Sequence, residues 1–209
     1  MQLEAGGAHD RRPGGAHRRA LMGLKALAET LPLWARDIRV NVENLTGSPS
    51  ALDEARLFST LLAAAAAARN PIVVREVEEE ARLHLSSRVL EAVYGTASVM
   101  GMNNVYYRAK HLLAQAGVTE YEGMSPRLRM QALRASGDVA RADIELWALA
   151  ASAVNGCGSC LAGHERSLRQ EGVSEEAVHE ALRVAAVINA AAAVLDAVDA
   201  AGPARPRPG

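Results

Sequence analysis

Cysteine, aromatic side chains and surplus charge are all scarce in this sequence. Its 209 residues include two cysteines, and aromatic residues make up 3% of the chain. Two cysteines cannot form the set of disulfide bonds that stabilises a small secreted domain. The 23 lysines and arginines nearly balance the 24 aspartates and glutamates. This balance argues against nucleic acid or an anionic membrane surface as the main partner.

Uninterrupted apolar runs long enough to cross a bilayer are missing as well. The alanine-rich run at 61–68 ends at Arg69 and is too short. The run at 184–198 is broken by Asn189 and Asp196. We interpret both runs as buried helices that pack closely through small side chains. Without a convincing membrane or secretion signal, we expect a cytoplasmic protein.

The two ends of the chain differ in composition from its middle. Residues 1–21 are rich in glycine, arginine and histidine, and we expect a disordered leader there. Residues 201–209 are rich in proline and arginine, which is typical of a flexible tail. The stretch between them, residues 22–200, is long enough for one helical domain.

Alanine and helical periodicity are what the chain has in quantity. Alanine has the highest helix propensity and no preference for strands. No segment alternates apolar and polar residues with a period of two over β-branched side chains. The sequence therefore predicts an all-α, multihelical protein.

Helix start and stop signals divide the predicted domain. The helical spacing from Leu24 to Asn44 is interrupted at Pro32. Asn70-Pro71 ends one helix and begins the next, because proline suits the first helical turn. The helices expected after Asn44 are 51–68 with Ser50 as its cap, 71–84, a Ser86-capped helix to Met100, 103–115, a short helix at 127–135, 142–154, 157–170, and about 175–200.

Two stretches of the sequence resemble each other. Leu57-Phe58 stands before an alanine-rich helix, a break, a polar helix and a serine-capped helix, and Leu146-Trp147 stands before the same order. The offset is close to 89 residues, which suggests a duplicated unit. We predict two similar helical halves, approximately 22–117 and 126–200, of which only the second contains cysteine.

The two cysteines stand three residues apart, at Cys157 and Cys160. Such a pair is either a redox-active dithiol, part of a zinc site, or a coincidence. Zinc requires four ligands, and His164 and Glu145 could complete the set. The residues alone leave the redox and metal interpretations open.

The expected geometry favours thiol chemistry. The turn signal Asn155-Gly156 predicts that Cys157 lies in the first turn of a helix, where free N–H groups lower the pKa of a thiol. His164 follows on the same helix face and can exchange protons with a cysteine. Glu145, on the preceding helix, can orient His164 through a hydrogen bond. Ser159 is small and can donate a hydrogen bond to a sulfur.

The pattern Glu-x11-Cys-x2-Cys-x3-His, occupied by Glu145, Cys157, Cys160 and His164, resembles the core motif of the alkyl hydroperoxide reductase D (AhpD) family. This family lies within the carboxymuconolactone decarboxylase superfamily. The segments AVNGCGSCLAGHE around the cysteines, SVMGMNNVYYR at 98–108 and LPLWARDIRVNVENL at 31–45 are similar to the family too. Decarboxylases of the superfamily lack the dithiol, so the resemblance favours the antioxidant branch.

This resemblance implies a homotrimer of all-α subunits with two similar halves. It implies a lipoyl-dependent antioxidant thiol peroxidase with a redox-active disulfide between Cys157 and Cys160. Cys160 becomes the sulfenic acid, assisted by His164 and Glu145. Cys157 is the more exposed thiol, which resolves the sulfenic acid and meets the protein partner. No tightly bound cofactor and no metal are implied.

The partners implied by the resemblance are the peroxiredoxin AhpC, as the protein substrate, and a lipoylated dihydrolipoamide acyltransferase with lipoamide dehydrogenase, as the electron source. One departure is visible, since some members have a histidine directly before the second cysteine, where this chain has Ser159. Two alternatives remain: a Cys/His/Glu metal-binding module, and a non-redox decarboxylase-like member that uses Glu145 and His164 as base and acid.

Overall fold

The computed structural model describes residues 23–47, 50–131, 137 and 139–202. All regular elements within these residues are helices, which confirms the predicted all-α fold. The predicted leader at 1–21 and residues 203–209 of the predicted tail lie outside the described residues.

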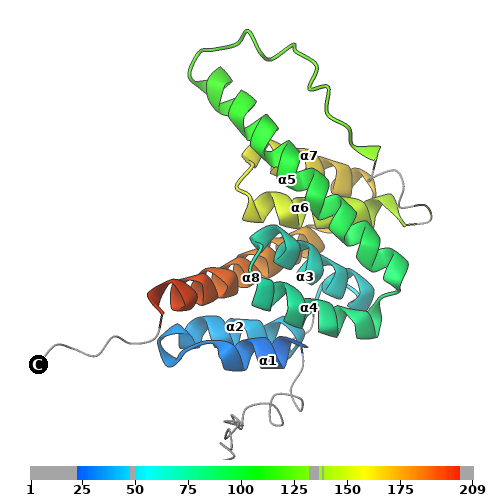
Figure 1. The fold of residues 1–209 in the computed structure, drawn as a ribbon. Coiled ribbons are helices and arrows are strands. Elements are labelled where there is room, and N and C mark those ends of the chain that lie inside the picture. Colours follow the sequence, from blue (N-terminus) through cyan, green and yellow to red (C-terminus); the bar gives the residue numbers. More distant parts are fainter. Residues whose placement is uncertain (1–22, 48–49, 132–136, 138, 203–209) are drawn as a thin grey trace, which may run out of the picture.

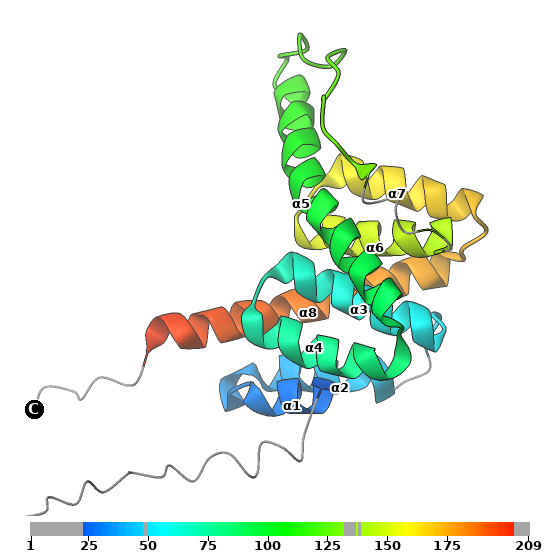
Figure 2. The same ribbon diagram turned by 45° about the vertical axis from the view of Figure 1, so that its right-hand side comes forward.

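A short helical hairpin begins the described chain. It contains α1 (Gly23–Thr30), the 3-10 helix η2 (Leu33–Ala35) and α2 (Arg36–Gly47). The predicted interruption at Pro32 is confirmed, because this residue lies between α1 and η2. Helix α1 packs on α4, and α2 packs on α8, so the hairpin covers one end of the helical body (Figures 1 and 2).

Two successive groups of three helices follow. The first contains α3 (Glu54–Ala68), α4 (Pro71–His84) and α5 (Ser87–Gln115), and the second contains α6 (Arg141–Val154), α7 (Gly158–Gln170) and α8 (Glu175–Ala201). The helix lengths match in order, at 15, 14 and 29 residues against 14, 13 and 27 residues. A repeated three-helix unit gives such a match, although the proposed division at 22–117 and 126–200 stays a prediction.

Helix α3 lies at the centre of the fold. It packs against α4, α5, α6 and α8 (Figure 1). Its alanines at 63–65 are completely buried, because small side chains let neighbouring helices approach closely. Helix α6 packs against α3 with large buried side chains, among them Leu146 and Trp147.

Three expected boundaries were wrong. The cap of α3 is Asp53, whose carboxylate accepts the Arg56 N–H at 2.8 Å, rather than Ser50, which forms a local turn with Leu52. A single helix, α5, replaces the two helices expected at 86–100 and 103–115, because the polar side chains near Gly101 find partners on other elements.

The start of the short helix expected at 127–135 is the third error. Residues 127–130 are not helical, and Arg127 has a left-handed backbone with φ of 48°. An isolated residue of this kind ends helical hydrogen bonding. Residues 132–135 lie outside the described residues.

Helix α8 is the one helix of the described residues that is long and apolar enough to cross a membrane. A core helix of a soluble protein has the same length and composition. One stripe of α8, which includes Ala181, Val184 and Ile188, is buried in the fold. The expectation of a buried helix is therefore right for this stripe. Over the most apolar 18 residues of α8 as a whole, 39% is buried inside the fold.

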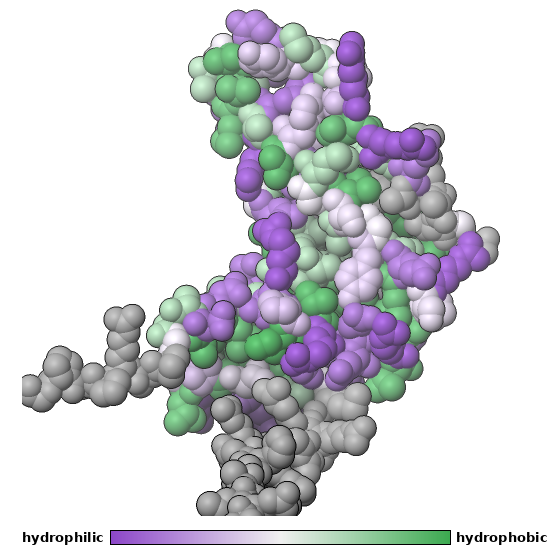
Figure 3. Space-filling view, viewed as in Figure 1, coloured by the Kyte–Doolittle hydropathy of each residue, from purple (hydrophilic) through white to green (hydrophobic). Residues whose placement is uncertain are grey.

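The second half of α5 extends beyond the helical body (Figures 1 and 2). Large apolar side chains are exposed on it and on the loop that follows; they are Val105, Leu112, Leu113, Tyr121 and Met124. Apolar surface gathers at this projecting end in Figure 3. Apolar clusters of this kind on a protein surface mark interaction sites more often than single exposed residues do.

Candidate functional site: a dithiol joint between α6 and α7

The turn between α6 and α7, residues 155–157, is called the α6–α7 joint below. The Cys157 N–H donates to the Ser152 carbonyl at 3.1 Å, and the Gly156 N–H donates to the Ala153 carbonyl at 3.1 Å. This pair of bonds is the Schellman arrangement that ends many helices. Gly156 has φ of 68°, a conformation that glycine adopts without steric cost. The predicted turn at Asn155-Gly156 is confirmed.

Cys157 and Cys160 form a disulfide bond with their Cα atoms 5.3 Å apart. Cys157 is the N-cap residue of α7, and Cys160 lies in the first turn. The two positions are therefore as close as the sequence spacing predicted.

The exposure of the two cysteines differs from the expectation. Cys157 is 0% exposed, while Cys160 is partly exposed. The expectation that Cys157 is the more accessible thiol was wrong for this disulfide-bonded state. Cys157 ends the Schellman turn of α6, next to Ser152 and Asn155, which α5 contacts, whereas Cys160 lies on α7 itself.

The start of α7 lacks a side-chain cap. Cys157 occupies the N-cap position but makes no side-chain hydrogen bond to the helix. The first N–H groups of a helix have no partner within the helix, and their partial positive charge stabilises an anion. A thiolate on Cys157 after disulfide opening gains this stabilisation. Ser159 Oγ lies 3.6 Å from Cys157 Sγ, within hydrogen-bonding range of sulfur, as predicted.

Glu145 and His164 meet beside the dithiol helix. The Glu145 carboxylate lies 2.7 Å from Nδ1 of His164, so the predicted hydrogen bond between them is present. Both side chains are largely buried, with 18% and 20% of their surface exposed. Arg141, one turn before Glu145 on α6, lies 3.8 Å from the other carboxylate oxygen. The carboxylate thus fixes the ring orientation of His164 and leaves Nε2 as the nitrogen available for proton exchange.

Within the described residues, His164 makes no hydrogen bond to either sulfur. A proton that passes between His164 and a cysteine therefore needs a bridging water or a rotation of side chains. The spacing in the sequence correctly put these groups on one helix, but the proton path itself is not closed in the disulfide-bonded state.

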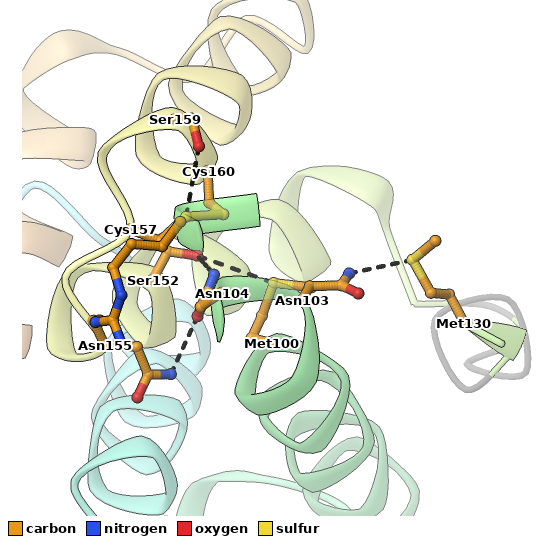
Figure 4. The surroundings of a disulfide bond; sticks show 10 residues. Met100, Asn103, Asn104, Met130, Ser152, Asn155, Cys157, Ser159 and Cys160 are labelled. Carbon is orange, nitrogen blue, oxygen red and sulfur yellow. Dashed lines mark hydrogen bonds between the residues drawn. A yellow bond between two sulfur atoms is a disulfide. The ribbon is translucent and has the colours of Figure 1, made fainter. Parts of the chain in front are cut away.

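Sequence reasoning missed the residues that support the α6–α7 joint from α5. Asn104 and Arg108 both bond to the joint, as Figure 4 shows for Asn104 and Asn155. A signal for them was present, because two adjacent asparagines in the interior of a long helix are unfavourable unless their side chains have partners elsewhere.

The described residues do not gather a metal site. No group of three or more His, Cys, Asp and Glu side chains in the described ranges is arranged to hold an ion. A cavity of about 470 Å³ is lined by residues such as Arg56, His84 and Trp147 and includes none of the four residues predicted for the site. The chemistry that this arrangement supports is thiol–disulfide exchange with a nearby proton carrier.

Comparison with known proteins shows the family. Residues 110–202 match the Carboxymuconolactone decarboxylase family, and this range includes all four predicted site residues. The chain is 46% identical over 178 residues to an alkyl hydroperoxide reductase AhpD of Frankia alni, covering 85% of this chain and 94% of that protein. It is 42% identical over 182 residues to one of Mycobacterium tuberculosis, covering 87% of this chain and 99% of that protein.

The chain belongs to the AhpD family. A further AhpD, of Streptomyces griseus, is 43% identical over 176 residues, covering 84% of this chain and 97% of that protein. Coverage of almost the whole length of these AhpD proteins extends the match to the N-terminal hairpin and the first helical group.

Proposed function

We propose that this protein reduces alkyl hydroperoxides through a dithiol–disulfide cycle of Cys157 and Cys160. The observation that carries the proposal is the disulfide at the uncapped start of α7, with the Glu145–His164 pair beside it. The AhpD names of its relatives supply the substrate class.

The oxidative half of the cycle begins on Cys160, the partly exposed thiol. Its thiolate attacks the terminal oxygen of the hydroperoxide, the O–O bond breaks, and the alcohol leaves after taking up a proton. The resulting sulfenic acid condenses with the Cys157 thiol, which forms the disulfide and releases water. Two electrons pass from the dithiol to the peroxide.

His164 carries the protons of this half-cycle, and Glu145 is a positioning residue. The imidazole accepts the proton of the Cys160 thiol and returns it to the leaving alkoxide. Glu145 holds the ring at Nδ1 and fixes its orientation. Ser159 takes the place of a second relay histidine, so we expect direct peroxide reduction to be slower than disulfide exchange.

The reductive half of the cycle uses a dihydrolipoyl group on a dihydrolipoamide acyltransferase, kept reduced by lipoamide dehydrogenase. One lipoyl thiolate attacks the Cys160 sulfur, because Cys157 is buried. Cys157 leaves as a thiolate at the start of α7, where the helix stabilises it. The second lipoyl thiol then displaces Cys160, and two electrons pass from the lipoyl dithiol to the protein.

The dithiol also reduces AhpC in our proposal. Exchange with the AhpC disulfide regenerates the Cys157–Cys160 disulfide and leaves AhpC as a dithiol. We place the cycle in the cytoplasm, and we expect a homotrimer, for which the exposed apolar side chains of the α5 projection offer a contact surface. Sedimentation that gives a monomer at working concentration would remove the trimer from the proposal without touching the dithiol cycle.

The experiment is peroxide-dependent oxidation of NADH with lipoamide and lipoamide dehydrogenase, with and without AhpC. We expect steady turnover that rises strongly when AhpC is added and disappears when both cysteines are replaced by serine. Full activity of that double variant would overturn the proposal. Zinc bound at one ion per chain that blocks thiol titration would support the metal-binding alternative instead.

The point of attack can be tested with single variants. In Cys157→Ser, the Cys160 thiolate attacks a dihydrolipoyl analogue activated as a thiopyridyl disulfide, displaces thiopyridone, and gives a stable mixed disulfide that mass spectrometry detects. A mixed disulfide that forms only in Cys160→Ser would instead assign the partner contact to Cys157.

A further inference from the structure

Helix α5 bonds to the α6–α7 joint through a buried asparagine. Asn104 Nδ2 donates to Ser152 Oγ at 2.8 Å, and Asn104 Oδ1 accepts from Asn155 Nδ2 at 3.0 Å (Figure 4). Asn104 is 1% exposed and Ser152 is 0% exposed. Removing a side chain from such a network leaves buried polar partners without hydrogen bonds.

Arg108 adds a second contact from the same helix. It lies four residues after Asn104 and therefore on the same face of α5. Its Nη1 donates to the Asn155 carbonyl at 2.6 Å, a group at the end of α6 of the kind that helices leave without an internal partner. Asn155 is thus held at both its side chain and its backbone. These four residues, Asn104, Arg108, Ser152 and Asn155, are called the clamp below.

Packing differs along the joint, because Cys157 is fully buried while Asn155 is partly exposed. Asn155 borders a cavity of about 330 Å³ whose other walls include Ala67, Arg69 and Gly101. A segment that faces open space on one side gains few dispersion contacts there. At Asn155, hydrogen bonds from the clamp therefore add restraint that packing on the cavity side does not supply.

The clamp acts on the residue that matters for redox chemistry. Ser152 accepts from Asn104 with its side chain, and its carbonyl accepts the Cys157 N–H at 3.1 Å. Asn155 is two residues before Cys157. The position of the Cys157 backbone therefore depends on two residues that α5 holds.

We propose that Asn104, assisted by Arg108, is a positioning residue that keeps the reduced Cys157 within disulfide-bonding distance of Cys160. When the disulfide opens, the covalent link no longer fixes the joint, and the clamp remains. A restrained pair of thiols has a higher effective concentration than a mobile pair, which favours disulfide formation and speeds the capture of a sulfenic acid. The consequence for turnover rests on the dithiol cycle proposed above, whereas the consequence for the disulfide equilibrium does not.

The neighbouring asparagine provides a matched control. Asn103 is 7% exposed, lies on the same helix, and donates from Nδ2 to the sulfur of Met130 at 3.1 Å. Figure 4 shows that this contact points away from the disulfide. An Asn103→Ala change removes a buried amide of the same size without touching the joint.

The test is the dithiol–disulfide equilibrium of the whole protein in dithiothreitol redox buffers, with melting temperature measured alongside. We expect Asn104→Ala to shift the equilibrium about tenfold toward the dithiol, which is about 30 mV for a two-electron couple. Asn103→Ala removes one bond to sulfur and an unpaired buried oxygen, so it should lower the melting temperature less than Asn104→Ala and leave the equilibrium within about twofold of the parent. Equal shifts in both variants, or none in Asn104→Ala, would overturn the proposal.

Arg108 supplies a variant that does not disturb the core, because its contact is exposed. We expect Arg108→Ala to shift the equilibrium in the same direction by about threefold, and Arg108→Lys to stay close to the parent, because an ammonium group can donate to the same carbonyl. An Arg108→Ala equilibrium equal to the parent would contradict the assisting role. Because no peroxide is present, these outcomes do not depend on whether the protein is a peroxidase.

Discussion

The α3–α4 and α6–α7 joints have the same backbone construction, but their side chains differ in chemistry. In the α3–α4 joint, residues 69–70, Arg69 has φ of 63° and Asn70 is the N-cap of α4. In the α6–α7 joint, Gly156 has φ of 68° and Cys157 is the N-cap of α7. Each joint is therefore one left-handed residue followed by an N-cap residue.

The N-cap residues satisfy their helices differently. The Asn70 side chain accepts the N–H groups of Ile72 and Val73 at 3.0 and 3.1 Å, and its amide donates to Asp196 of α8 at 2.6 Å. Cys157 makes no comparable bond to α7. The first joint is thus a stable connection between helices, and the second leaves its helix N-terminus available to an anion.

The helix positions after each N-cap continue this contrast. Three and seven residues after Asn70 stand Val73 and Val77, both buried in the core. At the same distances from Cys157 stand Cys160 and His164, both partly exposed. The comparison teaches that one structural unit supports either packing or chemistry, depending on three positions of the joint and its helix.

The largest difference between the joints should appear when these positions are changed. We predict that Cys160→Ser lowers peroxide turnover at least about a thousandfold, because no thiolate remains to attack. The equivalent change in the first joint, Val73→Ala, should cost about 1–3 kcal/mol of unfolding free energy and leave turnover almost unchanged. Coupled NADH oxidation and urea unfolding measure the two effects, and strong loss of turnover in Val73→Ala would break the contrast.

The residues that lie together at the site were easier to predict from the sequence than the ends of the helices were. Cys157, Cys160 and His164 could be predicted together because the i, i+3 and i, i+7 positions of one helix share a face. Glu145 lies on the preceding helix, and its place beside His164 was expected from the spacing of the family motif. The exposure of the two cysteines could not, because it depends on how α5 covers the end of α6. Long-range contacts of this kind leave no periodic signal in the chain.

The fold errors have a similar origin. The continuity of α5 through Gly101 and Asn103 could not be predicted, because glycine and asparagine locally favour a break. In the structure the asparagine side chains bond to Met130 and to the α6–α7 joint, which offsets their poor propensity. Tertiary contacts therefore keep α5 continuous where the local sequence favours a break.

The next largest effect concerns the proton carrier. His164→Ala should slow the reaction of the reduced protein with an alkyl hydroperoxide by about 10²–10⁴-fold, which is the usual contribution of a general acid–base group. Glu145→Gln should slow it less, by about tenfold, because the ring remains but loses the carboxylate that orients it. Single-turnover rates measured by thiol loss test this order, and a Glu145→Gln rate below the His164→Ala rate would reverse the two roles.

A smaller difference between the two joints should appear in the unfolding free energy when the N-cap of α4 is removed. Asn70→Ala removes both cap bonds and the bond to Asp196, so we predict a loss of about 1–3 kcal/mol in unfolding free energy. The dithiol–disulfide equilibrium should stay within about twofold of the parent, because this joint is not connected to the cysteines by hydrogen bonds. A stable Asn70→Ala protein would show that the cap of α4 adds nothing to the fold.

The smallest effect tests whether α7 lacks a cap. In reduced proteins, Cys157→Ser should be more stable than Cys157→Ala by about 1 kcal/mol, because serine is able to cap the helix. Both variants are inactive in the cycle, so only chemical denaturation of the reduced proteins is needed. Equal stability would indicate that the start of α7 is already satisfied in another way.

The central claim is that a hydroperoxide oxidises the α6–α7 joint directly. The most direct measurement mixes the fully reduced protein with one equivalent of an alkyl hydroperoxide and counts free thiols and intact mass. We predict the loss of two thiols for each peroxide consumed, with a mass decrease of about 2 Da that marks one disulfide. If both thiols stay free and the mass stays unchanged after incubation with one equivalent of peroxide, the proposed oxidation of the joint is contradicted.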